Sequence, residues 1–319
     1  MRILITGATG LVGREIVRLC HARGFTVNYL TTRREKITSS DNLHGFYWNP
    51  DNGEINLDCF SGVRAIINLA GASISKRWTP VYKKEILSSR VNSLRALHTA
   101  LGKIDTSPIK SFVSASAIGI YPSSLTEYYI EDETNVDQSF LGNVVQEWEK
   151  EIDAFKPFNF PVAKIRIGLV MSAKGGALPE MAKPIRNYMG AGFGSGQQWQ
   201  SWIHISDLAR MFIFVTENGL KGTYNGVGPN PVTNTKLIKE IAKVLNRPLF
   251  LPNIPKFVMT FILGEMAYLL FASQRVSSKR IEEEGFIFNF RNICKTLEHI
   301  YIGEPKESAE TLIQKESLS

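Results

Sequence analysis

The sequence predicts an α/β protein with a doubly wound parallel sheet and a smaller, mostly helical C-terminal substrate or cap domain. Three observations support this prediction. Short apolar runs alternate with amphipathic helical stretches as far as about residue 170, which is typical of repeated βαβ units. The apolar runs are nearly continuous, as expected for strands buried on both faces. Beyond that point the alternation stops, and glycine-rich and helical stretches follow.

The elements of the predicted sheet can be assigned in chain order from their apolar patterns. We expect strands at residues 2–6, 25–31, 64–70, 109–116, 162–170 and 222–228. We expect the main helices at residues 11–22, about 79–101 and 140–155. In the stretch "WIHISDLARMFIFV", Ser206 is expected to be the N-cap of a further helix.

The change of pattern predicts the domain boundaries. Residues 1–228 should form the nucleotide-binding domain, in which the glycine-rich segment 171–202 contributes to the substrate cleft, and residues 229–302 the small C-terminal domain. Residues 303–319 are polar and should form a flexible tail. The most apolar segment, 257–273, contains Gly264 and Glu265 and is short for a membrane span, so we expect a buried or groove-lining helix.

Composition excludes several classes of protein. The chain has 319 residues, 44% of them hydrophobic and 21% charged, as in soluble globular proteins. The net charge is +7, but no Lys/Arg block is interleaved with aromatic residues as nucleic-acid binding requires. The three cysteines lack metal-site spacing, so we expect no metal. Free thiols and the absence of a signal peptide favour a cytoplasmic protein without membrane insertion.

The stretch "ITGATGLVG" predicts a dinucleotide site. Gly7 lets the first strand turn tightly, Gly10 lets the backbone approach a pyrophosphate, and Gly13 lets the following helix pack on the sheet. The N-terminus of that helix then presents free N–H groups and the positive end of its dipole to the phosphates.

The end of the second strand predicts which dinucleotide binds. An acidic residue there would hold the ribose 2′-hydroxyl of NAD, whereas arginine accommodates a 2′-phosphate. The strand ends in "LTTRREK", with Arg33, Arg34 and Lys36 and no acid at its tip. We therefore expect NADP, with NADPH preferred over NADH; the alternative is a solvated basic turn.

Motifs along most of the chain resemble those of one known family. "TGATGLVG", "NLAG" (68–71), "SASAIGIY" (114–121) and "WIHISDLA" (202–209) are similar to signatures of the extended short-chain dehydrogenase/reductase superfamily. "INLAGASISKRWT", "SSRVNS", "RIGLVMSAKGGAL" and "NGVGPNPVTN" resemble its atypical, NADP-linked "epimerase family" proteins, which carry a C-terminal domain of unknown function. The resemblance implies a Rossmann-type fold, NADP binding and a sugar-nucleotide epimerase label that rests on fold.

The resemblance also implies roles for individual residues. Ser116 falls where the superfamily hydrogen-bonds the reacting oxygen, and the backbone of 168–170 would meet the nicotinamide amide. The residues expected to bind the cofactor are Thr6, Gly7, Thr9, Gly10, Leu11 and Val12 at the pyrophosphate, Arg33 and Arg34 at the adenosine phosphate, and Leu69, Ala70 and Gly71 at the adenine and ribose.

The chain departs from the superfamily in its proton donor. That role belongs to a Tyr followed four residues later by Lys, since the ammonium lowers the phenol pKa toward the working range. No Tyr in this sequence has Lys at that spacing, and the two places fall near Leu141 and Val145. Any catalyst must therefore be another group. The candidates are Ser116 as oxyanion donor with Tyr121, Glu149 or His204, although Glu149 also fits a solvated helix position and His204 a structural one.

A substrate site is expected from aromatic and amide side chains. Trp78 lies among basic residues in "SKRWTPVYKKE", which could hold an anionic substrate with Trp78 stacked on a ring, or form a solvated helix start. The stretch "GSGQQWQSWIH" provides Gln198, Trp199 and Trp202, which suit a flat polar ligand or a structural clasp. The leading hypothesis is an NADP-dependent oxidoreductase- or epimerase-like enzyme for a small polar, possibly sugar-nucleotide, substrate. The alternative is an NADPH-binding sensor or scaffold without turnover. A homodimer is left open.

Overall fold

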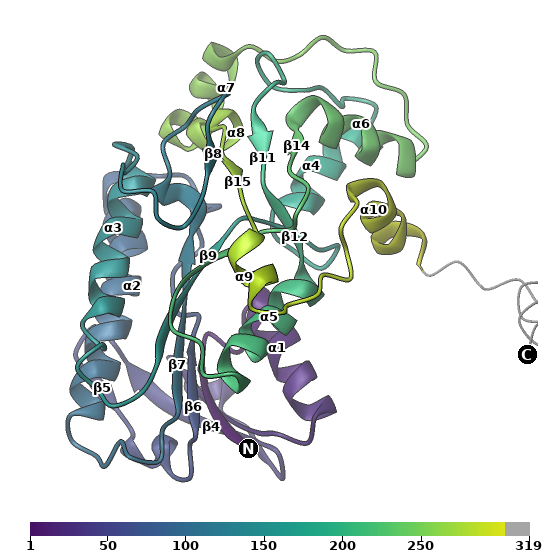
Figure 1. The fold of residues 1–319 in the computed structure, drawn as a ribbon. Coiled ribbons are helices and arrows are strands. Elements are labelled where there is room, and N and C mark those ends of the chain that lie inside the picture. Colours follow the sequence, from purple (N-terminus) through teal and green to yellow (C-terminus); the bar gives the residue numbers. More distant parts are fainter. Residues whose placement is uncertain (304–319) are drawn as a thin grey trace, which may run out of the picture.

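The computed structural model describes residues 1–303, so the predicted tail beyond Gly303 lies outside the described residues. A nine-stranded sheet forms the centre of the molecule (Figure 1). Its strands in spatial order are β13 (Gly222–Gly226), β9 (Val162–Ile167), β7 (Ser111–Ala117), β6 (Ala65–Asn68), β1 (Arg2–Thr6), β2 (Thr26–Thr31), β4 (Leu43–Asn49) and β3 (Ser39–Ser40), with β5 (Glu54–Ile55) paired to β4.

The sheet is parallel from β13 to β4, and only the short β3 and β5 run antiparallel to β4. The chain builds outward from β1 through β2 and β4, then returns to add β6, β7, β9 and β13 on the other side. The strand order therefore reverses between β1 and β6, and this switch point is where parallel α/β sheets open a crevice for ligands.

Helices cover both faces of the sheet, which confirms the predicted doubly wound α/β fold. The helices α1 (Leu11–Ala22) and α5 (Ile205–Glu217) pack together on one face, and α2 (Pro80–Leu101) and α3 (Phe140–Asp153) on the other (Figure 1). The starts of α2 and α3 are specified locally, because the side chains of Thr79 and Ser139 accept hydrogen bonds from backbone N–H groups of the first turn.

A second, smaller core joins the segment after β9 to the C-terminal region. Met171, Leu178 and Trp202 pack there with Leu237 and Leu297, and all five are fully buried. The elements around it are β10 (Leu169–Met171), α4 (Ala177–Arg186), β11 (Trp199–Gln200), β12 (Trp202–His204), β14 (Val232–Thr233), α6 (Asn234–Val244) and α10 (Ile293–Ile302). Residues 171–202 and 229–302 thus share one apolar cluster.

The remaining C-terminal elements lie against the opening of the sheet. β15 (Arg275–Val276) pairs with β8 (Tyr128–Tyr129), and Gln274 Nε2 donates to the carbonyl oxygen of Tyr121. The other short elements are α7 (Lys256–Leu263), α8 (Tyr268–Phe271), α9 (Lys279–Glu283) and the 3-10 turns η1 (Arg34–Lys36), η2 (Leu57–Phe60), η3 (Ile118–Ile120) and η4 (Gly264–Ala267).

Three local expectations differ from the structure. Strand β4 was not expected, because its sequence "LHGFYWN" mixes polar and apolar residues. The N-cap of α5 is His204 rather than Ser206: the ring Nδ1 of His204 accepts from the backbone N–H of Ser206. The single helix expected over 257–273 is broken at Gly264, which adopts a φ of 62°, and Phe261 on α7 is 89% exposed instead of buried.

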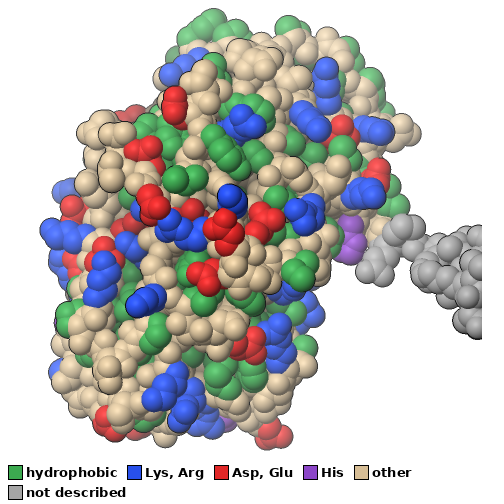
Figure 2. All heavy atoms as spheres, viewed as in Figure 1, with side chains coloured by type: hydrophobic (Ala, Val, Ile, Leu, Met, Phe, Trp, Pro, Cys, Tyr) green, Lys and Arg blue, Asp and Glu red, His purple; other side chains and the backbone are tan. Residues whose placement is uncertain are grey.

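Surface and helix properties agree with the composition. Within residues 1–303, the helices are all too short or too polar to cross a bilayer. Lys and Arg side chains are interspersed with Asp and Glu on the face drawn in Figure 2. The excess positive charge is therefore spread among acidic groups on that face.

Candidate functional site

A chain of hydrogen bonds fixes the carboxyl ends of three neighbouring strands at the switch point. The hydroxyl of Thr6 donates to Asn68 Oδ1 at 2.7 Å and accepts from the backbone N–H groups of Leu69 and Ala70 at 3.0 and 3.1 Å. Asn68 Nδ2 in turn donates to Ser114 Oγ at 3.0 Å. All three polar side chains are buried, so they hold the edge of the crevice rather than project into it.

The glycine turn leaves no room for side chains. Gly7 has a φ of +67°, and a Cβ there would lie 2.8 Å from the carbonyl oxygen of Leu69. A Cβ on Gly13 would lie 2.2 Å from the carbonyl oxygen of Gly7. Gly10 caps α1 without any side-chain hydrogen bond, and the first turn contains no acidic residue. The N–H groups at this helix end are thus left for an anion, which fits a pyrophosphate.

The two arginines after β2 differ in their surroundings. The Arg34 guanidinium lies 3.7 Å from the centroid of the Tyr47 ring and 3.9 Å from a carboxylate oxygen of Glu54. The Arg33 side chain is exposed, and within residues 1–303 it has no ion-pair or hydrogen-bond partner. A cavity of about 480 Å³ lies nearby, lined by residues that include Thr9, Tyr29 and Lys36.

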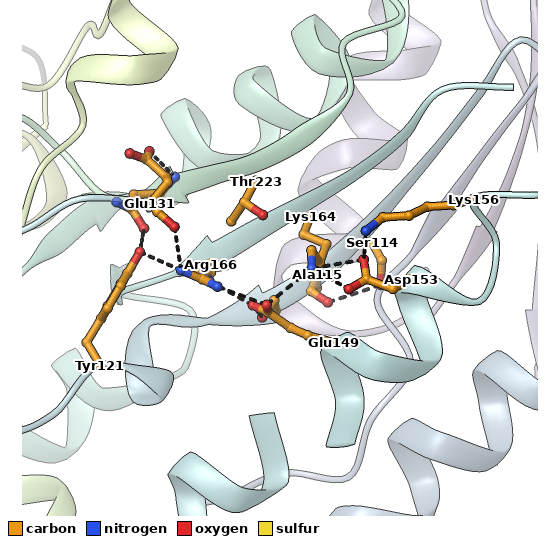
Figure 3. A network of polar contacts seen from close by, with 12 residues as sticks. Ser114, Ala115, Tyr121, Glu131, Glu149, Asp153, Lys156, Lys164, Arg166 and Thr223 are labelled. Atoms are coloured by element: carbon orange, nitrogen blue, oxygen red, sulfur yellow. Dashed lines mark hydrogen bonds and ion pairs between the residues drawn. The ribbon is translucent and has the colours of Figure 1, made fainter. Parts of the chain in front are cut away.

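Three of the four predicted catalytic residues belong to one buried polar network (Figure 3). Ser116 Oγ donates to Glu149 Oε1 at 2.6 Å, and the same carboxylate accepts from Arg166 Nε at 2.8 Å and Nη2 at 2.9 Å. Arg166 Nη1 donates to Tyr121 Oη at 2.9 Å, and Tyr121 donates to Asn225 Oδ1 at 2.7 Å. Glu149 is therefore not a solvated helix residue.

The network holds its members in fixed protonation states. Burial raises the pKa of Glu149, but the hydrogen bonds and charge of Arg166, with help from Lys164 and Ser116, outweigh burial and lower the pKa overall. Burial raises the pKa of Tyr121 to about 12 despite the nearby Arg166. A carboxylate that stays ionised and a phenol that stays protonated near neutral pH are poorly matched to proton transfer.

His204 lies apart from this network and has structural contacts. Its ring lies against Phe290, with centroids 3.8 Å apart, and near His299, with centroids 5.8 Å apart. Burial, followed by repulsion from His299, lowers the pKa of His204 to about 4. In this environment the His204 ring is neutral near pH 7 and caps α5.

A pocket of about 210 Å³ opens between the sheet and the C-terminal region. Ala117, Gly119 and Gly168 line it from the strand ends, and Leu141 and Val145 line it from α3. These last two lie near the places at which the sequence resemblance leads us to expect the Tyr and Lys of the superfamily. The C-terminal region contributes Tyr268, Leu269, Ala272 and Gln274.

The sequence matches the model of the NAD dependent epimerase/dehydratase family over residues 3–227, and that of a domain of unknown function, DUF1731, over residues 254–300. The chain belongs to the NAD dependent epimerase/dehydratase family. Epimerase family protein YfhF of Bacillus subtilis (strain 168) is 35% identical over 294 residues, which cover 92% of this chain and 95% of that protein.

Two solved structures resemble the chain over most of its length. The crystal structure of human epimerase family protein SDR39U1 (isoform 2) with NADPH has a TM-score of 0.82 and 30% identity, covering 95% of this chain and 99% of that one. A nucleoside-diphosphate sugar epimerase from Corynebacterium glutamicum has a TM-score of 0.77 and 25% identity, covering 100% of this chain and 62% of that one. The predicted epimerase-family resemblance is thereby confirmed.

The residues proposed from sequence as substrate contacts are mostly structural neighbours of the pocket. Trp78 is buried against Phe140, with ring centroids 5.2 Å apart. Trp202 is fully buried and donates from Nε1 to the carbonyl oxygen of Asn230. Gln198 is buried, and its side-chain Nε2 donates to the backbone carbonyl oxygens of Phe193 and Leu270. Among these four, only Trp199 lines the pocket.

Sequence reasoning missed several pocket residues. Arg90 and Trp148 lie on the helices α2 and α3, Gln200 follows Trp199, and Tyr268 comes from α8. Arg90 was noticed only as a letter in the family motif "SSRVNS". Arg90 is one of several cationic residues along α2, and helical periodicity alone does not show which of them reaches a pocket.

Proposed function

We propose that this chain binds NADP(H) along the Gly7–Gly13 turn and acts as an oxidoreductase- or epimerase-like protein on a small molecule held in the adjoining pocket. The observation that carries the proposal is the uncapped N-terminus of α1, which faces the switch point with its glycines packed too tightly for side chains. The presence of NADPH in the human relative supports the same cofactor. When bound, NADPH would supply the hydride.

The residues of this chain would have distinct tasks. The backbone of Gly7 to Val12 would hold the pyrophosphate, and Arg33 and Arg34 the adenosine phosphate. Leu69, Ala70 and Gly71 would line the ribose, where Thr6 fixes the backbone of Leu69 and Ala70. We also propose that the C-terminal region closes the pocket, since Tyr268 and Leu269 form part of its wall.

A second function, NADPH binding without turnover, is favoured by the composition of the pocket wall. Leu141 and Val145 cannot move protons, and the candidate groups Ser116, Tyr121 and Glu149 are engaged in the buried network. In such a sensor or scaffold, NADPH would bind and stabilise the folded protein rather than react.

Two measurements test these functions. Calorimetry with pure protein should detect NADPH binding, with NADPH tighter than NADH; the absence of heat for either would overturn both functions. NADPH oxidation is then followed across a panel of carbonyl compounds, and epimerisation of sugar nucleotides is scored separately because it consumes no net cofactor. Binding without any conversion would select the sensor. The cytoplasmic location and a homodimer stay predictions, which cell fractionation and light scattering would check.

A further inference from the structure

The helix α7 and the segment before it expose a concentration of apolar side chains. Within residues 1–303, sixteen large hydrophobic side chains are exposed, and five of them fall between residues 250 and 262. They are Phe250, Leu251, Phe257, Phe261 and Ile262. None of the eight residues of α7 is buried. Exposed apolar groups gathered in this way mark an interaction surface.

The side chains of α7 project outward rather than line a groove. Phe257 and Phe261 are 75% and 89% exposed, and their spacing of four residues puts them on the same face of the helix. Together with Ile262 they form a surface that we call the aromatic ridge. Figure 1 shows α7 at the periphery of the molecule, beside α8. An occupant of the ridge must therefore provide an apolar medium for projecting rings, not a shape that fills a cavity.

The chain around the aromatic ridge is basic. Residues 245–264 contain Arg247 and Lys256 and no Asp or Glu. The next acid, Glu265, pairs with Lys83 on α2 at 2.5 Å, which brings the basic start of α2 beside η4. Lys84 follows there and is exposed, as is Lys256. We call Lys84 and Lys256 the basic border of the ridge.

This charge distribution distinguishes the possible occupants. In a symmetric pair of chains the same surface faces itself, so the cations of two basic borders would come together and repel. A bilayer with anionic headgroups offers the opposite charge and an apolar layer beneath it. Aromatic and aliphatic side chains enter that layer without a fitted cavity. Both charge and shape therefore favour lipid over a second copy.

The length of α7 determines how it would lie on a bilayer. Its eight residues span about 12 Å at about 1.5 Å per residue, whereas the hydrocarbon core of a bilayer is about 30 Å thick. The helix can thus rest in the headgroup region with its apolar face inward, and it cannot cross.

We propose that the aromatic ridge and its basic border dock this protein on the surface of a bilayer that contains anionic phospholipids. Because α7 continues through η4 into Tyr268 and Leu269, which line the pocket described above, docking would bring that pocket close to the bilayer. The docking requires neither a bound dinucleotide nor turnover, so it stands apart from the proposed function.

The first test uses the unchanged protein and sedimentation with vesicles. Vesicles of phosphatidylcholine and phosphatidylglycerol in equal parts should bind it about tenfold or more tightly than vesicles of phosphatidylcholine alone. Raising the salt from about 0.1 M to about 1 M shortens the screening length to about 3 Å and should weaken the binding. Equal binding to both vesicle types, or binding to neither, would overturn the proposal. Vesicle binding by a protein that fails to bind NADPH would overturn only the proposed function.

Variants of the aromatic ridge test its apolar part. Phe257→Ser combined with Phe261→Ser should weaken binding to the anionic vesicles about tenfold or more and leave the Kd of NADPH unchanged. The matched control, Leu57→Ser combined with Ile287→Ser, alters two exposed side chains outside the ridge and should bind vesicles like the wild type. If light scattering shows a dimer that the Phe257/Phe261 variant converts to a monomer, a second copy covers the ridge and the proposal is wrong.

Variants of the basic border test its charge. Lys84→Gln combined with Lys256→Gln should reduce the preference for phosphatidylglycerol, because each cation near the surface adds to the attraction. Lys103→Gln combined with Lys221→Gln removes the same charge from two exposed positions, one after α2 and one directly before β13. An equal loss of preference in both double variants would show that net charge alone acts, and would overturn the role of the border.

Discussion

The carboxylate of Glu149 holds the guanidinium of Arg166 through two hydrogen bonds of 2.8 and 2.9 Å, with both side chains buried. This pair joins α3 to strand β9, and Ser116 at the end of β7 donates to the same carboxylate. Ser116 and Glu149, two of the predicted catalytic residues, therefore connect α3, β7 and β9 in this protein, and the first two predictions test the contribution of the Glu149–Arg166 pair to stability.

Glu149→Gln should destabilise the fold by about 3–5 kcal/mol near pH 7, because it leaves the buried charge of Arg166 without a counter-ion. Urea unfolding followed by circular dichroism measures this change. Glu147→Gln, on the exposed side of the same helix, should stay within about 0.5 kcal/mol of the wild type. Equal changes in unfolding free energy for the two substitutions would show that the Glu149–Arg166 pair makes no special contribution to stability.

The contribution of Glu149 should also depend on pH. Its folded-state pKa is lowered from 4.5, so the stabilisation is fully present above about pH 4.5 and is lost as pH falls through the folded-state value. The difference in unfolding free energy between wild type and Glu149→Gln should therefore narrow in acid. Unfolding curves recorded between pH 7 and the lowest pH at which the protein stays folded would show it; a constant difference would contradict the assignment.

His204 predicts a loss of stability in mild acid. Its pKa falls from 6.5 to about 4 on folding, so the unfolded chain binds the proton more readily as pH drops below 6.5. At pH 5 this costs the folded state about 2 kcal/mol relative to pH 7.5. His204→Asn keeps a good N-cap residue for α5 and should remove this loss of about 2 kcal/mol in unfolding free energy between pH 7.5 and pH 5. As the control, His98→Asn changes an exposed residue and should leave the pH dependence of the unfolding free energy as in the wild type.

Gly7→Ala should abolish measurable NADPH binding and lower stability. The new Cβ would meet the carbonyl oxygen of Leu69 at 2.8 Å, and the φ of +67° disfavours any side chain. Gly24→Ala is the matched control, because Gly24 has a φ of +70° with nothing within 4 Å of the added Cβ. It should cost about 1–2 kcal/mol from the backbone alone and leave NADPH affinity intact. Titration calorimetry of both variants decides the matter.

Arg33 should contribute more than Arg34 to the preference for NADPH over NADH. Arg34 already stacks on Tyr47, whereas the Arg33 side chain is exposed and would gain a new charge-assisted bond. Arg33→Ala should raise the Kd of NADPH about tenfold, corresponding to about 1.4 kcal/mol, and leave that of NADH within twofold; Arg34→Ala should have a smaller effect. Equal losses for both cofactors would remove the argument for a 2′-phosphate site.

The sequence predicted those features whose signal is local. The strands around Ile3 and Phe112 are buried on both faces, so their apolar runs are plain in the chain. The glycine turn likewise needs only its own residues and the strand before it. Strand β4 lies near the edge of the sheet, where half-buried residues leave a mixed pattern.

The pocket was less predictable because it depends on which helical residues tertiary packing brings to the strand ends. Arg90 and Trp148 come from different helices. The Arg90 Cζ lies 5.0 Å from the centroid of the Trp148 ring, and neither helix alone predicts this contact. The same holds for the buried polar network: Arg166, which joins Glu149 to Tyr121, lies within the predicted strand 162–170, and the strand pattern alone does not show which polar groups it contacts.

The pairing of β15 with β8 also has a consequence for how such chains diversify. Residues 273–277 contact the loop around residues 121–131 through backbone and side-chain bonds, including those of Gln274 to Tyr121 and of Ser273 to Ser124. A C-terminal segment taken from a distant relative would lack the matching residues for these contacts with the loop. Chimeras between family members should therefore take residues 273–277 and the loop 121–131 from the same parent. A change of ligand preference in this region would then require coordinated substitutions in both segments.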